Sequence, residues 1–425
     1  VFPVLQQAKI IKGSYRQQYS KNYMKTGGKA MTDFDNSSFI CKGDKLYTND
    51  ISAIGTAVGL SGIGKKTGVA TDGSRAAKSA AYSIMGALSS ASSRVWDFGE
   101  SFYAQFQYLV KFCSLDSGIF ISRKNAQTVI RICGKNGLPI SINAQNEIES
   151  IMNNSKFLED KPAFCGEISE MHGVGMMYLR QLLRQARGEL KNISCFVKCR
   201  NDKISSLMED CLYRLECRQG DEMTLKINND GKSLSVFHRD CGWLSFDRIS
   251  AILVKYETQS GNDIAVPFNS PFALSEIAEN EGAKVYRYSL FDTEMPADIQ
   301  RVVDNCTFLT DGLFAAIKLL WMICDTGKSV AKLSGELPDF YVSRKITDSP
   351  FDASSFSREC EKNGIIIKNG VAILDYPKGR ATVTPSRTGN KIHIMSEAAN
   401  YEISKEICDI TTERFINQSI DTNGK

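Results

Sequence analysis

A segment near the C-terminus gathers the groups that bind phosphate: hydroxyls, cations and a tight turn. The segment reads TPSRTGN over residues 384–390. Its candidate phosphate-binding residues, together with the basic residues that follow, are Ser386, Arg387, Thr388, Lys391 and His393. Hydroxyls, backbone N–H groups and cations around such a turn stabilise a phosphate dianion. We therefore predict an anion site here; the alternative is a Ser/Thr-rich β-turn.

A second hydroxyl lies beside two cations in Ser122-Arg123-Lys124, which follows the apolar run 118–121. Arg123 and Lys124 are suited to binding a phosphate, because Arg donates in a planar fork and Lys supplies a compact charge. The alternative is a polar serine at a strand end that takes no part in a reaction.

The cysteines and histidines do not form a metal-binding pattern. The chain has 13 cysteines, an odd number, with no Cys-x-x-Cys pair, and 3 histidines. The closest set is Cys195, Cys199, Cys211 and Cys217. These spacings exclude the common zinc and iron–sulfur motifs. We interpret the cysteines as small buried residues of a protein in the reducing cytoplasm.

Composition sets the broad class. The chain has 425 residues, 42% of them hydrophobic and 24% charged, with a net charge of +4. That length predicts about three domains, and no apolar run reaches the roughly 18 residues of a membrane span. The charge is too balanced to indicate nucleic-acid binding. Residues 1–30 are basic and contain no acidic residue. They do not form a secretory signal, and we expect them to be a disordered arm.

Strands and helices alternate over most of the chain. The predicted strands are 68–72, 95–99, 118–122, 193–197, 225–227, 234–237, 264–267 and 284–286. The predicted helices are 76–92, 102–112, 176–190, 245–255, 270–281, 311–324 and 330–337. Such alternation predicts an α/β fold with helices on both faces of a sheet. After residue 345, three strands (370–374, 381–384 and 391–395) and a helix (400–417) predict a small α+β domain.

Several short motifs follow one another in a characteristic order. They are Asp72-Gly73-Ser74-Arg75, VWDFG at 95–99, DSGIFIS at 116–122, Asn269-Ser270, DGLFAA at 311–316, Leu337-Pro338, PSRT at 385–388 and Glu397-Ala398. Their order, over about residues 31–420, resembles the α-D-phosphohexomutase superfamily of phosphomannomutases and phosphoglucomutases. The resemblance implies four domains around a central cleft, three related α/β domains and a small α+β fourth.

The family's loops suggest where domains divide on this chain. After the arm at 1–30, the first domain would be 31–157, with the serine loop. The second would be 158–245, with the metal loop. The third, 246–345, would carry the sugar loop, and the fourth, 346–425, the phosphate loop.

The resemblance implies that Ser122 is the candidate catalytic residue, as the phosphoryl-carrying nucleophile, with Lys124 beside it and Arg123 binding phosphate. The family's loop reads Thr-Ala-Ser-His-Asn-Pro, whereas this chain has a loop one residue shorter at 122–126. Ser122 therefore stands either at the nucleophile or at the preceding Thr.

The metal and sugar loops depart further from the family pattern. For the family's Asp-Gly-Asp-x-Asp-Arg, this chain offers NNDGKS at 228–233, with Asp230 as the candidate metal ligand. One carboxylate beside Lys232 is a poor site for Mg²⁺, which prefers several oxygens, and an Asn-Asp-Gly turn is the alternative. Lys232 would replace part of the metal's charge. Glu294 is the candidate sugar-binding residue, but Pro296 and Asp298 stand where the family has Ser and His.

We therefore expect a phosphohexomutase-like protein that is catalytically impaired and binds a hexose phosphate or similar anion in its cleft. The first alternative is an active, divergent phosphomannomutase or phosphoglucomutase that uses Ser122; only then is Mg²⁺ expected as a cofactor. The second is a structural or interaction protein with a closed cleft. We expect a cytoplasmic location and neither nucleic acid nor membrane as a partner.

Overall fold

The computed structural model describes most of the chain. The described residues are 31–35, 38–41, 48–125, 127–154, 164–289, 295–348, 353–368, 370–386 and 391–417. The arm predicted at 1–30 lies outside them. No helix in these ranges has the length and apolar character needed to span a membrane.

The N-terminal unit is a seven-stranded mixed sheet. Its strands, in spatial order, are β1 (Met31–Asp35), β2 (Ser38–Cys41), β6 (Gln127–Gly134), β5 (Ser117–Lys124), β3 (Lys66–Thr71), β4 (Arg94–Glu100) and β7 (Ile168–Glu170). β5, β3, β4 and β7 are parallel, whereas β6 and β2 are antiparallel to their neighbours. Parallel strands end at one edge of a sheet, so Thr71, Glu100 and Lys124 lie along the same edge.

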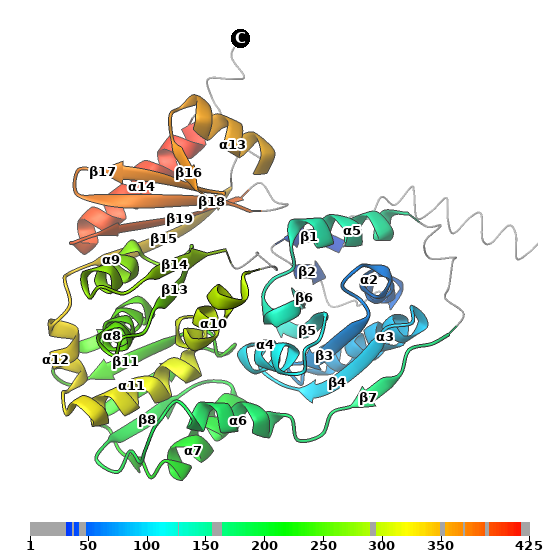
Figure 1. The fold of residues 1–425 in the computed structure, drawn as a ribbon. Helices are drawn as coiled ribbons and strands as arrows, with labels where there is room; N and C mark the ends of the chain where they lie inside the picture. Colours follow the sequence, from blue (N-terminus) through cyan, green and yellow to red (C-terminus); the bar gives the residue numbers. More distant parts are fainter. Residues whose placement is uncertain are drawn as a thin grey trace, which may run out of the picture.

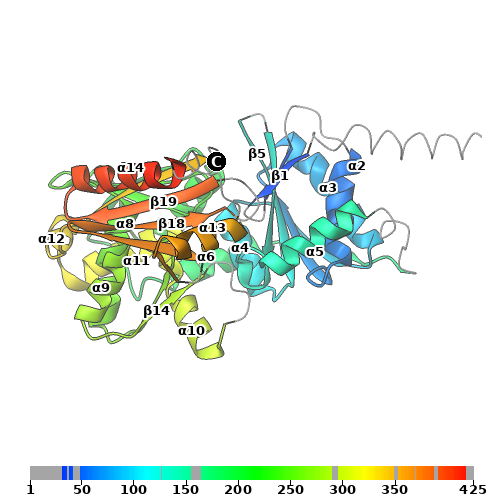
Figure 2. The same ribbon diagram turned by 90° about the horizontal axis from the view of Figure 1, so that it is seen from above.

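Helices cover both faces of this sheet. α2 (Thr48–Leu60), α3 (Arg75–Ser90) and α5 (Ile142–Asn153) pack on one face, and α4 (Tyr103–Phe112) packs on the other. Successive residues separate accordingly: Ile119 belongs to the first core and Phe120 to the second, as the two-residue period of a strand requires. Figure 2 shows α4 on the side of the sheet that faces the rest of the molecule.

The middle of the chain holds two sheets that share one core. The second sheet has the order β12 (Gly242–Leu244), β11 (Leu234–His238), β10 (Met223–Ile227), β8 (Ser194–Lys198) and β9 (Arg218–Gln219), and the third pairs β13 (Ile264–Pro267) with β14 (Val285–Tyr288). Their helices are α6 (Gly175–Leu183), α7 (Asp202–Arg214), α8 (Phe246–Gln259), α9 (Phe272–Asn280), α10 (Ala297–Asn305), α11 (Gly312–Thr326) and α12 (Val330–Gly335). One continuous hydrophobic cluster runs through both sheets, and it also includes Phe102 and Ala104 of the first unit.

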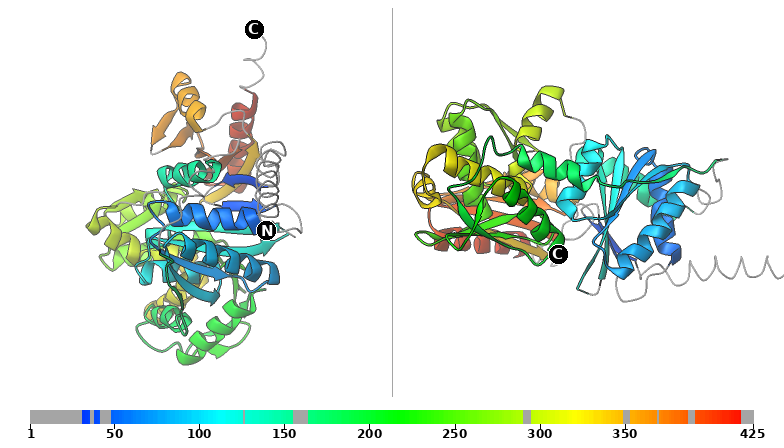
Figure 3. Two further views of the ribbon diagram at one scale, coloured as in Figure 1. Left: turned by 90° about the vertical axis from the view of Figure 1, so that its right-hand side faces the viewer. Right: turned by 90° about the horizontal axis from the view of Figure 1, so that it is seen from below.

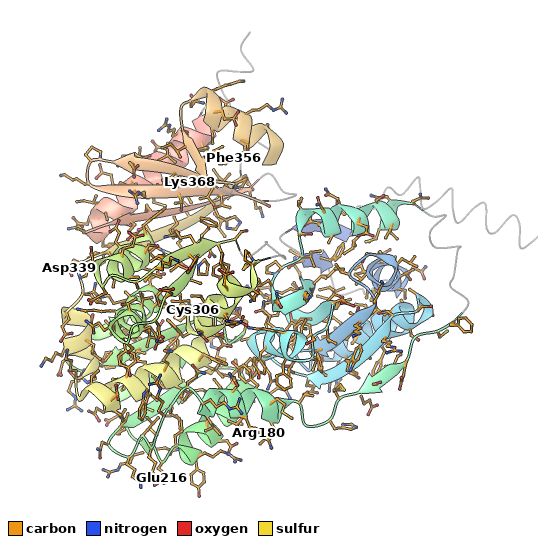
Figure 4. The ribbon with its side chains drawn as sticks, viewed as in Figure 1. Arg180, Glu216, Cys306, Asp339, Phe356 and Lys368 are labelled. Carbon is orange, nitrogen blue, oxygen red and sulfur yellow. The ribbon has the colours of Figure 1, made fainter. Side chains whose placement is uncertain are left out.

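The C-terminal unit is an antiparallel sheet with two helices. The sheet has the order β15 (Tyr341–Asp348), β19 (Lys391–Ala398), β18 (Gly379–Pro385), β17 (Val371–Tyr376) and β16 (Ile366–Lys368), with α13 (Ala353–Lys362) and α14 (Tyr401–Asn417). It stands at one end of the molecule (Figure 1), and Phe356 and Lys368 lie there, far from Arg180 and Glu216 at the other end (Figure 4). In Figure 3, left, the C-terminal unit, in orange and red, lies above the N-terminal unit, in blue and cyan.

The α/β fold class is confirmed, and each predicted strand and helix has a counterpart. One helix is shorter than predicted: α6 ends at Leu183 rather than at residue 190. Beyond it Gly188 packs against the ring of Trp321, and the Leu190 N–H donates to the Leu215 carbonyl. These contacts lead the chain away from the helix axis and into β8. The domain boundaries remain predictions.

A carboxylate joins the third and fourth sheets. Glu397 on β19 accepts hydrogen bonds from the N–H groups of Phe272 (2.7 Å) and Ala273 (2.8 Å), the first residues of α9. These N–H groups have no partner within the helix, and the helix dipole favours a negative charge there. Burial raises the pKa of Glu397, and the hydrogen bonds from the N–H groups of Ala273 and Phe272 oppose that shift because they favour the charged carboxylate.

We predict that Glu397→Ala lowers the free energy of unfolding by about 1–3 kcal/mol, because it leaves two buried N–H groups without an acceptor. Urea denaturation measures the effect. The matched control is Glu406→Ala on the exposed side of α14, which should change stability by less than about 0.5 kcal/mol. Equal stability of the two variants would contradict this role for Glu397.

Candidate functional site: a cleft where the four sheets meet

The turn between β10 and β11 lies at the centre of the molecule and is tightly packed. Gly231 has a φ of +80°. A Cβ atom on it would come within 3.0 Å of Ala104 and Phe102 and 3.1 Å of Leu313. The backbone angle favours glycine, and the close neighbours leave little space for a side chain. The turn therefore fits one arrangement of its neighbours.

Backbone hydrogen bonds attach this turn to two helices. The Asp230 carbonyl accepts from the Ala104 N–H (2.9 Å) in the first turn of α4, and the Gly231 carbonyl accepts from the Gly312 N–H (2.8 Å) at the start of α11. Each N–H is one that its own helix leaves without a partner. The turn is thus bonded to the N-terminal unit through α4 and to the shared core of the second and third sheets through α11.

Lys232 directly follows Gly231 in this turn, and its side chain lines the cavities described below. Its ammonium donates to the Gln107 amide oxygen on α4 at 2.9 Å. Burial lowers the pKa of Lys232, while the carboxylates of Asp311 and Asp230 oppose that shift. The guanidinium of Arg131, 4.7 Å from the centroid of the Tyr103 ring, lowers it further. Two carboxylates and one guanidinium therefore act on the buried ammonium of Lys232.

Asp311 is the buried acid beside Lys232. It is 4% exposed, and its Oδ1 caps α11 by accepting from the N–H groups of Leu313 (2.9 Å) and Phe314 (3.2 Å). Its Oδ2 accepts from the Tyr178 hydroxyl at 2.7 Å. Burial raises the pKa of Asp311 to about 6, although Lys232 and these hydrogen bonds favour the charged form.

Two cavities meet at Lys232. The larger, of 330 Å³, is lined by elements of all four sheets. Its lining includes Tyr103, Gln107, Lys232, Asp247, Asn269 and Arg344. The smaller, of 80 Å³, lies between α4 and α10. Small-molecule sites typically begin at about 300 Å³ and mix apolar walls with a few polar groups, so the larger cavity suits a small polar ligand.

The other cations along these cavities are paired with acids. Arg344 donates to both carboxylate oxygens of Asp247, at 2.6 and 2.8 Å. Lys111 contacts Asp304 at 2.5 Å. Lys232 differs, because its hydrogen-bond acceptor in the described part of the chain is a neutral amide.

Ser122 lies in a β-ladder. It is paired with Val129 across the β5–β6 hairpin, and Lys124 is paired with Gln127, so two residues form the connection. The side chains of Arg123 and Lys124 are exposed. The Arg123 N–H donates to the Asp72 carboxylate at 2.7 Å, and the same carboxylate accepts from the Ser74 N–H (2.9 Å) and hydroxyl (2.7 Å).

Comparisons with known proteins agree on one fold. No family model matches the chain. Phosphoglucosamine mutase of Bacillus cereus is 20% identical, over 73% of this chain and 79% of that protein. A phosphoglucomutase/phosphomannomutase family protein of Burkholderia thailandensis superimposes with a TM-score of 0.67 at 15% identity, covering 88% of this chain and 95% of that one. The chain has the phosphohexomutase fold. A putative phosphomannomutase of Thermus thermophilus covers 88% of this chain and 96% of its own length, with a TM-score of 0.59 at 13% identity.

Within the phosphohexomutase fold, the turn at 228–233 stands where the resemblance implies a metal loop. Asp230 directs its Oδ1 to the N–H of Lys232 at 2.9 Å, and both oxygens of Asp311 are already engaged. No group of three or more His, Cys, Asp or Glu residues that could hold a metal occurs in the described ranges. Mg²⁺ prefers octahedral coordination by oxygen, and the side chains around Lys232 do not provide it.

The predicted phosphate loop is only partly described. Ser386 is buried at the end of β18, where its N–H donates to the Lys391 carbonyl at 2.7 Å. Lys391 is exposed, and His393 pairs with Thr384 across the β18–β19 ladder. Arg387 and Thr388, like Glu294 of the sugar loop, lie outside the described residues. The binding roles of all these residues remain predictions.

The site also contains residues that the sequence reasoning did not select. Gln107 and Tyr178 are ordinary helical residues with no motif around them. Arg344 and Asp247, which form an ion pair, are 97 positions apart in the sequence. Asp311 carried a signal, because an Asp directly before an amphipathic helix is a typical N-cap.

We predict that Asp311→Asn alters the pH dependence of stability. With a pKa near 6, the folded protein takes up a proton that the unfolded chain binds only near pH 4, so this group stabilises the fold as pH falls. Relative to the asparagine variant, the wild type should gain about 1 kcal/mol of unfolding free energy between pH 7 and pH 5. Urea denaturation at both pH values measures this.

The control for Asp311→Asn is Asp298→Asn, at an exposed position in the first turn of α10. The difference between wild type and this control should be the same at both pH values. A parallel pH dependence of wild type and Asp311→Asn would show that Asp311 titrates at its ordinary pKa.

Proposed function

We propose that this protein binds a sugar phosphate in the cleft where its four sheets meet and that it has lost most phosphohexomutase turnover. The observation that carries the proposal is the 330 Å³ cavity, which is lined from all four sheets and contains the cation of Lys232. Its other walls combine apolar side chains, amide and hydroxyl groups and the ion pair of Arg344 with Asp247, and apolar walls with a few polar groups orient a small ligand.

The class of ligand is supported by the comparisons. The curated relative from Bacillus cereus is named a phosphoglucosamine mutase, so glucosamine phosphates are the first candidates, followed by other hexose phosphates. We expect neutral polar groups of the lining, such as Gln107 and Asn269, to bind the sugar. A cytoplasmic location, where such metabolites occur, remains a prediction.

The loss of turnover is supported by the loops on which phosphoryl transfer depends. Phosphoryl transfer is catalysed mainly by positioning and by neutralising charge. Here Ser122 is held in a short hairpin, and the turn at 228–233 provides one carboxylate where the family uses several. Removing a single positioned catalytic group costs on the order of 10²–10³ in rate, and two such losses would leave little activity.

We predict that millimolar glucosamine 6-phosphate raises the thermal midpoint of the protein, whereas unphosphorylated glucosamine does not. A ligand at ten times its Kd adds about 1.4 kcal/mol, which corresponds to about 1.5 °C for a chain of this size. Differential scanning fluorimetry measures the shift. If no hexose phosphate shifts the midpoint, the cleft is closed and the protein is a structural or interaction protein.

The same protein is then assayed for turnover with glucose 1-phosphate and mannose 1-phosphate, Mg²⁺ and a hexose bisphosphate activator. We expect no rate above background, and none that differs between wild type and Ser122→Ala. Turnover that disappears in Ser122→Ala would contradict the loss of catalysis and establish an active, divergent mutase.

A further inference from the structure

We infer that Lys232 is a tethered cation that takes the place of a divalent metal ion in the cleft, so that the phosphate of the ligand binds there without metal. This inference deepens the proposed function and rests on it for the identity of the ligand. It concerns the means of binding, which the proposed function leaves open.

The position of the ammonium is fixed by the backbone around it. The residue before it, Gly231, is closely surrounded by Ala104, Phe102 and Leu313, and the carbonyls of Asp230 and Gly231 are bonded to the starts of α4 and α11. Gln107 then holds the ammonium at 2.9 Å. A long lysine side chain ordinarily loses much conformational entropy when it binds a ligand. Here the side chain is already ordered in the folded protein, so less entropy remains to be lost on binding.

The charge of Lys232 is available to a ligand. The cleft's other lining cations, Arg344 and Lys111, each contact a carboxylate, at 2.6 and 2.5 Å, whereas Lys232 donates to a neutral amide. Asp311, the nearest buried acid, directs its oxygens to the Tyr178 hydroxyl and to the N-terminus of α11. Asp311 and Asp230 act on Lys232 through their charge, but in the described part of the chain its hydrogen-bond acceptor is the Gln107 amide, so a phosphate entering the larger cavity would give it an anionic hydrogen-bond partner.

The same arrangement disfavours a divalent cation. An ammonium on the turn repels a second positive charge at short range. The Oδ1 atom of Asp230 accepts a hydrogen bond from the Lys232 N–H within the same turn, so this oxygen is already engaged. The nearby guanidinium of Arg131 on β6 adds to the positive potential. The site therefore attracts an anion directly, whereas a metal site would first have to bind a cation.

The test is calorimetric titration of the full chain with glucosamine 6-phosphate and, separately, with inorganic phosphate, in EDTA and in Mg²⁺. We expect the affinities in the two buffers to agree within about twofold. Lys232→Met, which keeps the length of the side chain, should weaken binding by about ten- to a hundredfold, and Mg²⁺ should not restore it. Lys232→Arg should retain binding within a few-fold.

The matched control is Lys226→Met, an exposed lysine on the adjoining strand β10, which should bind like wild type. Thermal unfolding of each variant confirms that it is folded. Sugar-phosphate binding that requires Mg²⁺, or that Lys232→Met leaves unchanged, would overturn the inference while leaving the proposed function intact. Lys232-dependent binding of inorganic phosphate without binding of the sugar phosphate would overturn the proposed function and support the inference.

Discussion

The carbonyls of Asp230 and Gly231 accept hydrogen bonds from the first N–H groups of α4 and α11, two helices that belong to different units. Helix starts carry N–H groups that must find acceptors elsewhere, and here the turn at 228–233 supplies them for both. Gly231 has a φ of +80° and lies close to Ala104, Phe102 and Leu313, so the turn packs tightly between the two helices. The position of the N-terminal unit relative to the core of the second and third sheets follows from it.

The electrostatics of the cleft depend on the same turn. It places Lys232 beside the buried Asp311, whose pKa is raised to about 6 by burial. Two buried charges of opposite sign seldom stabilise a fold by much, since desolvation offsets their attraction. Their value here is positional: Asp311 is fully engaged by Tyr178 and by α11, which leaves the ammonium facing the cavity.

Each strand and helix that local sequence patterns predicted is present in the structure. The long-range contacts within the site could not be inferred from such local patterns. The NDG turn between two apolar segments indicated the β10–β11 hairpin, and Asp311 preceded an evident amphipathic helix. β6 was missed, because residues 122–126 were expected to form a loop; instead Ser122, Arg123 and Lys124 pair with β6, which begins at Gln127. Tyr178 and Asp311 lie 133 positions apart, and no local pattern predicts that they meet.

We infer that Lys232 binds the phosphate of the ligand directly. It lies on the turn at 228–233, where the relatives that share this fold are expected to bind a metal ion. A crystal structure of the protein with glucosamine 6-phosphate tests it most directly. The account predicts a phosphate oxygen about 3 Å from the Lys232 ammonium, in the cavity beside Gln107, with no metal ion between them and no phosphoryl group on Ser122. A divalent ion bound to Asp230 and bridging to the phosphate would contradict the account, as would a phosphorylated Ser122.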